Sequence, residues 1–287
     1  MFHRPLSIED SKRDRFERVL ETCEAETDAA VDRTLAAVPL ESLREQVAAT
    51  VFSPSDALPK RNRRPKREIT MLLDGLETTV GGIGDNRKPL LSFGLIVNEY
   101  YDICDDVVDQ DVVSDSRAEV ILTWQVMVPL LARLVHRLGT PAVEFWSDRA
   151  MGLIEAPFVA LRAEPSRDTY KKVLDRQADL FGCLTGLCGL LGECDEETII
   201  ACEDIGRAFF KFEQLLLDGE QFADGETAGW NAFVLLDSDR VISRIATIRS
   251  EYRATLAELP GEPAQKLEWL VAVDLNRWQR EVFDTDG

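Results

Sequence analysis

The chain has 287 residues and carries 52 Asp and Glu against 33 Lys and Arg, a formal net charge of −19. This charge repels nucleic-acid phosphates and anionic lipid headgroups, so we expect neither a nucleic-acid partner nor an electrostatically bound membrane. Hydrophobic residues make up 45% of the chain, which excludes a disordered acidic tail and is enough for a sizeable core.

Hydrophobic residues recur every three to four positions along almost the whole chain, which predicts an all-α protein. No stretch rich in Ser, Gly or Pro divides the sequence and no internal repeat occurs, so we expect a single domain over residues 1–287 with about ten helices. Ser7 and Ser166 are the expected N-caps of two of them. In chain order, the expected helices cover 7–38, 41–52, 66–80, 89–110, 115–138, 141–162, 167–191, 195–224, 228–236, 239–258 and 262–284.

The sequence predicts a soluble, cytoplasmic protein without a transmembrane segment. Its first residues lack the apolar stretch of a signal peptide. The longest apolar run, residues 120–135, contains Gln125, Pro129 and Arg133, and we expect it to be too short and too polar to span about 30 Å of hydrocarbon. Arginine is much commoner than lysine, and acidic residues are spread along the whole chain. This composition suits a halophilic protein that stays soluble in high salt.

The cysteines and histidines offer little for metal or nucleophilic chemistry. The two histidines, His3 and His136, are far apart, which argues against a His-based metal site or a catalytic triad. The six cysteines show no Cys-x-x-Cys spacing and lie mostly in apolar helical stretches, so we expect buried free thiols rather than disulfides or a zinc site. They are Cys23, Cys104, Cys183, Cys188, Cys194 and Cys202.

The densest acidic cluster lies within residues 98–111. At 100° per residue, Asp102, Asp105, Asp106 and Asp109 fall within one helical stripe about 100° wide. Their mutual repulsion costs stability near a helix C-terminus unless a cation compensates it. Mg²⁺ suits such a stripe, because it takes one or two carboxylates and fills other positions with water or phosphate oxygens. A solvated acidic face on an acid-rich protein is the alternative interpretation.

A basic cluster of opposite character occupies residues 60–67, where six of eight residues are Lys or Arg. Pro65 suits the first position of the next helix, so the cluster lies at a helix N-terminus, where backbone N–H groups favour an anion. Arginine pairs bidentately with phosphate oxygens. A nuclear-localisation-like patch or a solvated loop would explain the cluster alone. Together, the two clusters indicate a polyanion held between magnesium ions and arginines.

With these two clusters in this order, the chain resembles the trans-isoprenyl diphosphate synthases. Residues 61–65 are similar to the basic segment that precedes a helix in that family, and residues 105–109, Asp-Asp-Val-Val-Asp, match its first aspartate-rich motif. Residues 175–181 look like its Lys-Thr-x-x-Leu segment, and residues 206–210 look like its Gly-x-Ala-Phe-Gln segment. Small residues at 182–189 are similar to those that border the prenyl cavity in the family. The resemblance covers roughly residues 40–240 and implies an isoprenoid synthase-type helical bundle around a central cavity.

The resemblance implies a set of site residues and a Mg²⁺ cofactor. The metal ligands would be Asp105, Asp106, Asp109, Glu213 and Asp218. The substrate diphosphate would be bound by Arg61, Arg64, Arg176 and Arg117. Two aromatic residues would floor the cavity and limit the product to about C15–C20 through their bulk; they are Tyr100 and Tyr101.

The chain also departs from the family pattern. Its second aspartate-rich motif keeps Glu213 as the only aligned carboxylate, with Asp218 one position late. Arg176 and Phe210 stand where the family has Lys and Gln. The pair of arginines that follows the first motif in the family is reduced to Arg117.

These residues predict a Mg²⁺-dependent prenyltransferase that condenses isopentenyl diphosphate with an allylic prenyl diphosphate, with a homodimer as the expected assembly. One alternative is a catalytically weak or inactive paralogue that regulates an active prenyl synthase in a heteromer. Another is a terpene-cyclase-like enzyme on the same fold, because Asp218, Phe222 and Glu226 have the four-residue spacing of the cyclases' second metal motif.

Overall fold

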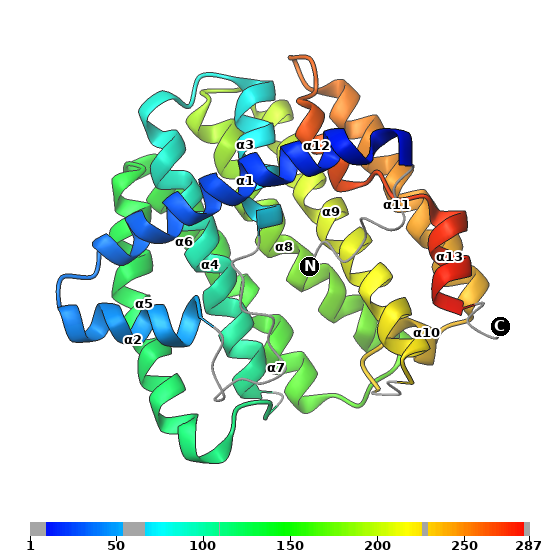
Figure 1. Cartoon of the computed structure of the whole chain (residues 1–287), viewed down its shortest axis with the longest axis horizontal. Coiled ribbons are helices and arrows are strands. Elements are labelled where there is room, and N and C mark those ends of the chain that lie inside the picture. Colours follow the sequence, from blue (N-terminus) through cyan, green and yellow to red (C-terminus); the bar gives the residue numbers. More distant parts are fainter. Residues whose placement is uncertain (1–9, 54–66, 109, 226–228, 284–287) are drawn as a thin grey trace.

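The structure, a computed structural model, describes residues 10–53, 67–108, 110–225 and 229–283, and within these ranges the regular elements are all helices (Figure 1). This confirms the all-α fold. The α-helices are α1 (Asp10–Ala36), α2 (Glu41–Val51), α3 (Arg67–Val80), α4 (Arg87–Val108), α5 (Arg117–Arg137), α6 (Thr140–Leu153), α7 (Glu155–Arg162), α8 (Arg167–Leu191), α9 (Glu196–Ala223), α10 (Ala232–Leu235), α11 (Ser238–Glu258), α12 (Gln265–Leu270) and α13 (Leu275–Phe283).

Most helix ends lie where the sequence predicted them. Helix α8 covers the predicted range 167–191, and the predicted N-cap Ser166 forms a capping box with Thr169. The backbone N–H of Thr169 donates to Ser166 Oγ at 3.2 Å, and the backbone N–H of Ser166 donates to Thr169 Oγ1 at 2.8 Å. This exchange satisfies two N–H groups that a helix start leaves without partners. Ser7 lies outside the described residues.

Two predicted helices are each divided in two. The range 141–162 contains α6 and α7, and α6 ends at Leu153. Pro157 explains this end, because its ring displaces the carbonyl four residues earlier, which belongs to Leu153, and it has no N–H to donate. The range 262–284 contains α12 and α13. Asp274 caps the start of α13, since its Oδ1 accepts from the backbone N–H groups of Asn276 and Arg277 at 3.1 Å each.

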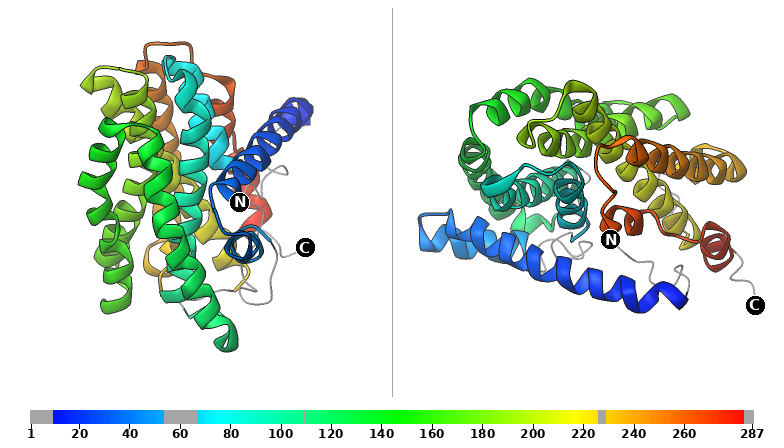
Figure 2. Two further views of the ribbon diagram at one scale, coloured as in Figure 1. Left: turned by 90° about the vertical axis from the view of Figure 1, so that its left-hand side faces the viewer. Right: turned by 90° about the horizontal axis from the view of Figure 1, so that it is seen from above.

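Helices α8 and α9 form the most extensive helix pair of the bundle and lie side by side at its centre (Figure 1, Figure 2). Glycines allow this close approach. A Cβ at Gly206 would lie 2.3 Å from the Phe181 carbonyl oxygen, and a Cβ at Gly182 would lie 2.9 Å from Arg207 Cγ. The expectation that small residues at 182–189 border a cavity is therefore wrong: Gly182, Gly186 and Gly189 face α9.

Helix α1 crosses one face of the bundle over α3 and α4 (Figure 2). Beneath it, α3 carries Asp74, a buried carboxylate that the sequence did not single out. Asp74 accepts a 2.8 Å hydrogen bond from Arg87 Nε at the start of α4, and it pairs with Lys266 of α12. A buried charge needs such partners, so this cluster links the consecutive helices α3 and α4 to α12, which is distant in the sequence.

Helix α5 is longer and more apolar than we expected from the sequence. The segment Ser114–Arg137 has a mean hydropathy of 1.5 over its most apolar 18-residue window, long and apolar enough by composition to cross a membrane, and 39% of that window is buried in the bundle. The expectation that this run is too short and too polar is therefore wrong. The helix lies against α4, α2 and α6, and its buried residues, among them Val120, Met127 and Leu134, belong to the core of the bundle.

The cysteines are free thiols, as expected, and four of the six are buried. Burial raises the pKa of Cys183 to about 12 and that of Cys202 to about 12. Both thiols therefore remain protonated at neutral pH and behave as small apolar core residues.

Candidate functional site

The C-terminal end of α4 carries the first acidic cluster. Asp102, Asp105 and Asp106 lie in its last two turns, and the last turn has no basic residue. The helix ends in a Schellman-like turn, in which the backbone N–H of Asp111 donates to the Asp106 carbonyl at 2.9 Å and Gln110 adopts a φ of 63°. The carboxylates therefore stand at the negative end of the helix dipole, which increases the attraction for a cation.

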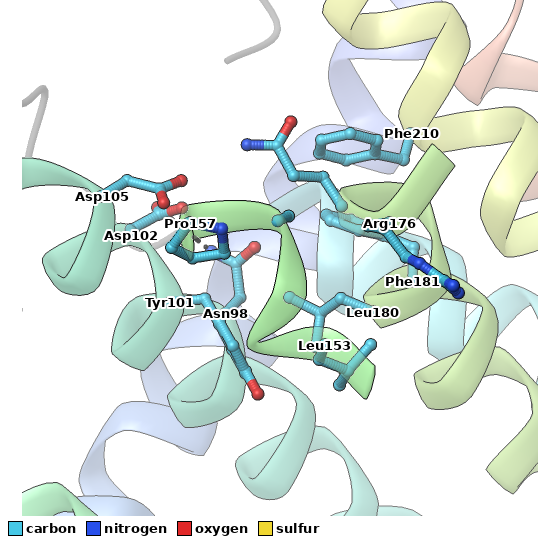
Figure 3. A pocket seen from close by; sticks show the side chains of 12 residues that line it. Asn98, Tyr101, Asp102, Asp105, Leu153, Pro157, Arg176, Leu180, Phe181 and Phe210 are labelled. Carbon is cyan, nitrogen blue, oxygen red and sulfur yellow. Dashed lines mark hydrogen bonds between the residues drawn. The ribbon is translucent and has the colours of Figure 1, made fainter. Parts of the chain in front are cut away.

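Asp102 and Asp105 line a pocket with a volume of about 60 Å³ between α4, α7, α8 and α9 (Figure 3). The acidic side faces an apolar body, and the basic residue Arg176 lies on the opposite wall. The broken helix supplies three of the lining residues, from the end of α6 and the first turn of α7. The lining residues are Asn98, Tyr101, Asp102, Asp105, Leu153, Ala156, Pro157, Arg176, Gln177, Leu180, Phe181 and Phe210.

The fold thus brings together Asp105, Arg176 and Tyr101, three of the residues that the sequence selected. They come from two helices that are about 70 positions apart along the chain. Neighbouring Asn98 donates a 3.3 Å hydrogen bond to Asp102 Oδ2. Carboxylates and a guanidinium on facing walls can hold a polyanion with its counter-cations, and the apolar lining excludes water around it.

Of the two aromatic residues predicted to set the product length, one lines the pocket, although the rings of Tyr100 and Tyr101 pack edge to face with centroids 5.3 Å apart. Tyr101 lines the pocket, and burial raises the pKa of its phenol. Tyr100 is not among the pocket residues; its ring packs on Trp124 of α5 with centroids 5.3 Å apart. On the opposite wall, the rings of Phe181 and Phe210 lie 4.8 Å apart. The aromatic lining of the pocket is therefore Tyr101 with these two phenylalanines.

Arg176 is held by two carboxylates in the structure. Its Nε lies 2.9 Å from Glu155 Oε2 of α7, and its Nη1 lies 3.2 Å from Asp179 Oδ2 on the next turn of α8. Glu155 also pairs with Lys172 at 2.6 Å. The hydrogen bond from Lys172 is the main cause that lowers the pKa of Glu155.

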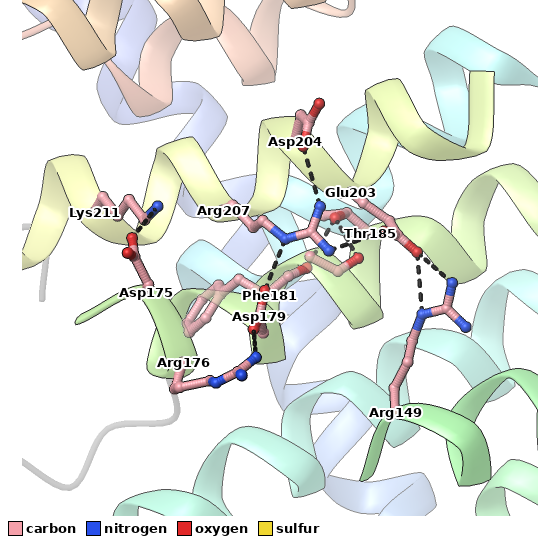
Figure 4. Close-up of polar contacts among 11 residues, drawn as sticks. Arg149, Asp175, Arg176, Asp179, Phe181, Thr185, Glu203, Asp204, Arg207 and Lys211 are labelled. Atoms are coloured by element: carbon pink, nitrogen blue, oxygen red, sulfur yellow. Dashed lines mark hydrogen bonds and ion pairs between the residues drawn. The ribbon is translucent and has the colours of Figure 1, made fainter. Parts of the chain in front are cut away.

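Asp179 connects Arg176 to a larger ion-pair network between α8 and α9 (Figure 4). Arg207 donates to Asp179 at 2.9 Å and to the buried Glu203 at 2.9 Å. Arg149 of α6 approaches Glu203 from the other side at 2.8 Å. Residue types alone did not reveal this network. The three-residue spacing of Arg176 and Asp179, and the four-residue spacing of Glu203 and Arg207, are signals that could have indicated it.

The second acidic side is placed differently from the first. Asp218 is fully buried, and its carboxylate accepts hydrogen bonds from the Tyr170 hydroxyl at 2.6 Å, the Ala232 backbone N–H at 2.8 Å and Gln214 Nε2 at 2.8 Å. It does not line the pocket. Glu213 is half-buried and lies three residues after Phe210, so both share one side of α9. Among the described residues that line the pocket, α9 contributes Phe210 alone.

Other predicted residues lie away from the pocket or outside the described ranges. Arg117 is exposed in the first turn of α5, and Asp106 also lies off the pocket lining. Arg61, Arg64 and Asp109 are outside the described residues, as is Glu226 of the cyclase-like spacing. In the part of the chain that the structure describes, no three His, Cys, Asp or Glu side chains are grouped closely enough to hold a metal ion by themselves.

Phe222, the central residue of the cyclase-like spacing, packs inside the bundle. Its ring lies 6.0 Å from that of Phe233 and 6.5 Å from that of Phe283. Asp218 is engaged in buried hydrogen bonds. Asp218 and Phe222 therefore both contribute to the packing of the C-terminal helices. The structure therefore gives the cyclase-like alternative no support.

No known protein-family profile matches the sequence, and no curated protein sequence matches it. Solved structures do match its fold. A geranyltranstransferase from Methanosarcina mazei matches with a TM-score of 0.69 and 14% identity, covering 89% of this chain and 97% of that chain. A decaprenyl diphosphate synthase from Rhodobacter capsulatus matches with a TM-score of 0.70 and 16% identity, covering 91% of this chain and 99% of that chain.

A third similar structure is a polyprenyl synthase from Caulobacter crescentus complexed with calcium and isoprenyl diphosphate. It matches with a TM-score of 0.67 and 14% identity, covering 91% of this chain and 97% of that chain. At these identities the likeness is one of fold, and it extends over nearly the whole length of each of these proteins. The chain therefore has the all-α fold of the prenyl diphosphate synthases.

Proposed function

We propose that this protein is a prenyltransferase that condenses isopentenyl diphosphate with an allylic prenyl diphosphate. The observation that carries the proposal is the pocket that Asp102 and Asp105 line on one side and Arg176 lines on the other, with apolar residues between them. This arrangement combines ligands for a diphosphate and its cations with a dry space for a hydrocarbon chain. The fold shared with three prenyl synthases supports the same reaction class.

The donor set fits Mg²⁺ bound together with a diphosphate. Asp102 and Asp105 supply hard carboxylate oxygens, and Mg²⁺ needs only one or two carboxylates when water and phosphate oxygens complete its shell. We propose Asp105, Asp106 and Asp109 as metal ligands, with Glu213 as the acidic residue of the facing helix; Asp218 is not part of this site. When bound, the metal neutralises charge that develops on the departing diphosphate.

The chain's own residues bind and enclose the substrate. Arg176 would bind the diphosphate by charge-assisted hydrogen bonds, and we propose Arg61, Arg64 and Arg117 as further diphosphate ligands. The rings of Tyr101, Phe181 and Phe210 exclude water from the ionising carbon. Their faces carry negative charge density that favours a nearby cation. Both effects act more strongly in a pocket of low polarity than in water.

We propose a short product of about C15–C20, limited by Tyr101 through its bulk. Tyr100 packs against Trp124 and would act on product length only through the position of its neighbour.

The test is a condensation assay with the purified protein. Mg²⁺, labelled isopentenyl diphosphate and C5, C10 or C15 allylic diphosphates are supplied at low and at multimolar salt, because the acid-rich composition suits a halophilic protein. We expect a labelled prenyl diphosphate at one or more conditions. Absence of product at every condition, with the helical circular dichroism spectrum intact, contradicts the proposal.

A regulatory paralogue is the second candidate, and one observation favours it. The wall that α9 contributes to the pocket is Phe210, while Asp218 of the same helix is engaged in buried hydrogen bonds. A protein of this kind would keep one diphosphate-binding wall and tune an active synthase. Co-purification with prenyl synthases from the same cell separates the candidates, because a paralogue would associate stably with one of them and an independent enzyme would not.

We also propose a cytoplasmic homodimer. Between Glu119 and Arg133, the sequence of α5 contains no charged residue, yet Leu122 is 67% exposed and Val128 is 45% exposed. Two chains with a net charge of −19 repel each other over most of their surfaces. This uncharged stretch with exposed apolar residues lacks that repulsion and therefore suits an interface. A second copy of the chain, packed α5 against α5, would cover this face symmetrically.

A further inference from the structure

Arg176 stands on the wall between two hollows. One is the pocket that contains Asp102 and Asp105, and the other is an open depression on α8 that is also lined by Lys172 and Asp175. Figure 3 shows its guanidinium directed away from the two aspartates. The guanidinium of Arg176, the group best suited to bind a diphosphate, therefore lies on the side of the open depression and not of the pocket.

Two carboxylates account for this orientation. Glu155 holds Arg176 Nε at 2.9 Å, and Asp179 holds Nη1 at 3.2 Å. The two carboxylates belong to different helices, α7 and α8, so the guanidinium is fixed from two directions. The Arg176 side chain is nevertheless 43% exposed. Solvent screens ion pairs at such exposure and weakens them, so a ligand can displace them.

Asp179 itself is held in place. Its Oδ1 accepts from Arg207 Nε at 2.9 Å (Figure 4). The other guanidinium nitrogens of Arg207 donate to the buried Glu203 at 2.9 Å and to Asp204 at 3.0 Å. The close packing of α8 on α9 fixes this arginine, because Gly182 leaves room for its side chain. Asp179 can therefore release Arg176 and keep its position through its ion pair with Arg207.

We propose that Glu155 and Asp179 are positioning residues that hold Arg176 outside the pocket and release it to a bound diphosphate. This inference rests on the proposed function. On binding, the guanidinium exchanges two carboxylates for phosphate oxygens, so the number of its ion pairs is conserved. A diphosphate can offer oxygens from two phosphate groups in this exchange, whereas a monophosphate offers those of one, and the exchange therefore favours a diphosphate.

The experiment is calorimetric titration of the full-length protein with inorganic pyrophosphate in Mg²⁺, and separately with inorganic phosphate. Glu155→Gln and Asp179→Asn each remove one competing carboxylate. We expect each to tighten pyrophosphate binding about two- to fivefold and to reduce the preference for pyrophosphate over phosphate. In an Arg176→Ala background, the same substitutions should change neither value.

Two matched controls keep the charge change constant. Asp204→Asn removes another carboxylate partner of Arg207 that does not contact Arg176. Asp168→Asn removes an acidic residue that lines the open depression with Arg176. Both should leave the dissociation constant for pyrophosphate unchanged. Thermal unfolding of each variant checks that the fold is retained.

The outcomes separate this inference from the proposed function. Tighter binding by the two test variants and not by the controls supports it. Unchanged binding by the test variants, or equal tightening by the controls, overturns it while the proposed function stands. Failure of the unaltered protein and of every variant to bind pyrophosphate overturns both.

Discussion

The phenol of Tyr170 on α8 donates a 2.6 Å hydrogen bond to the carboxylate of Asp218 on α9, which has no exposed surface. The same carboxylate oxygen accepts from the Ala232 backbone N–H at 2.8 Å, which joins the start of α10 to the pair. Burial and the Asp218 charge both raise the pKa of Tyr170, so the phenol stays protonated and continues to donate. These bonds give Asp218 a structural role.

Tyr170→Phe should lower the free energy of unfolding by about 1.5–3 kcal/mol, because it removes a donor from a buried charged acceptor. Tyr252→Phe is the matched control. The buried Tyr252 hydroxyl donates to the neutral Leu267 carbonyl at 3.0 Å, and we expect a loss of only about 0.5–1.5 kcal/mol. Urea denaturation followed by circular dichroism measures both. Equal losses would show that the charge of Asp218 contributes nothing.

Gly206→Ala should destabilise the protein by about 1–3 kcal/mol or more, because the added Cβ meets backbone that cannot move aside. It would lie 2.3 Å from the Phe181 carbonyl oxygen and 2.3 Å from Thr185 Oγ1. Gly152→Ala in α6 is the control, since a Cβ there meets nothing within 4 Å. We expect it to be neutral or to stabilise by up to about 1 kcal/mol. Thermal unfolding compares the two, and a harmless Gly206→Ala would refute the close packing of α8 on α9.

Asp105→Asn should reduce kcat of the proposed condensation by about 100- to 1,000-fold, the usual effect of losing one electrostatic contact to developing charge. Asp115→Asn is the control, because Asp115 is an exposed acid in the turn after α4 and does not line the pocket. Its activity should match that of the unaltered protein. Steady-state kinetics in Mg²⁺ measures both, and similar rates for the two variants would exclude Asp105 from the site.

Stability should fall in alkaline solution because of buried thiols. The pKa values of Cys183 and Cys202 are raised by burial from 9.0 to about 12 each. The fold therefore retains protons that the unfolded chain loses, so this contribution is fully present below pH 9 and is lost as pH rises from 9 towards 12. Urea denaturation at about pH 8 and about pH 10.5 measures the loss. The double variant Cys183→Ala, Cys202→Ala should lose less, and an equal loss would assign the effect to other groups.

Leu122→Glu should dissociate the proposed dimer, because it adds a charge to the apolar face of α5 between two acidic chains. Ile200→Glu is the control: Ile200 is 49% exposed on α9, away from that face. Sedimentation velocity at low and high salt measures the assembly. A monomer in the unaltered protein, or a dimer that survives Leu122→Glu, would place any interface elsewhere.

Local signals predicted much of the fold. The start of α8 was predicted correctly because Ser166 and Thr169 form a capping box within the segment itself. The end of α6 was missed although Pro157 was visible, because the apolar periodicity continues through the break into α7. The break before α13 depends on Asp274, whose capping role became clear only from its contacts.

The site was predictable in part for a related reason. The order of motifs along the chain selected Asp105 and Arg176, which line the same pocket in the structure. Helical periodicity shows which residues share a face, but it does not show which neighbour that face meets. The glycines of α8 were therefore assigned to a cavity although they meet α9, and Asp218 was assigned to a metal although it meets Tyr170.

The contact between α8 and α9 has a consequence for how this pocket can change during evolution. Gly182 and Gly206 bring the two backbones together, so the spacing of Arg176 and Phe210 is set by main-chain contact and tolerates little drift. The facing walls are under no such restriction, because Leu153 and Pro157 lie at a helix break. We expect descendants of this protein to acquire deeper or shallower pockets by substitution at that break, while the paired helices remain constant.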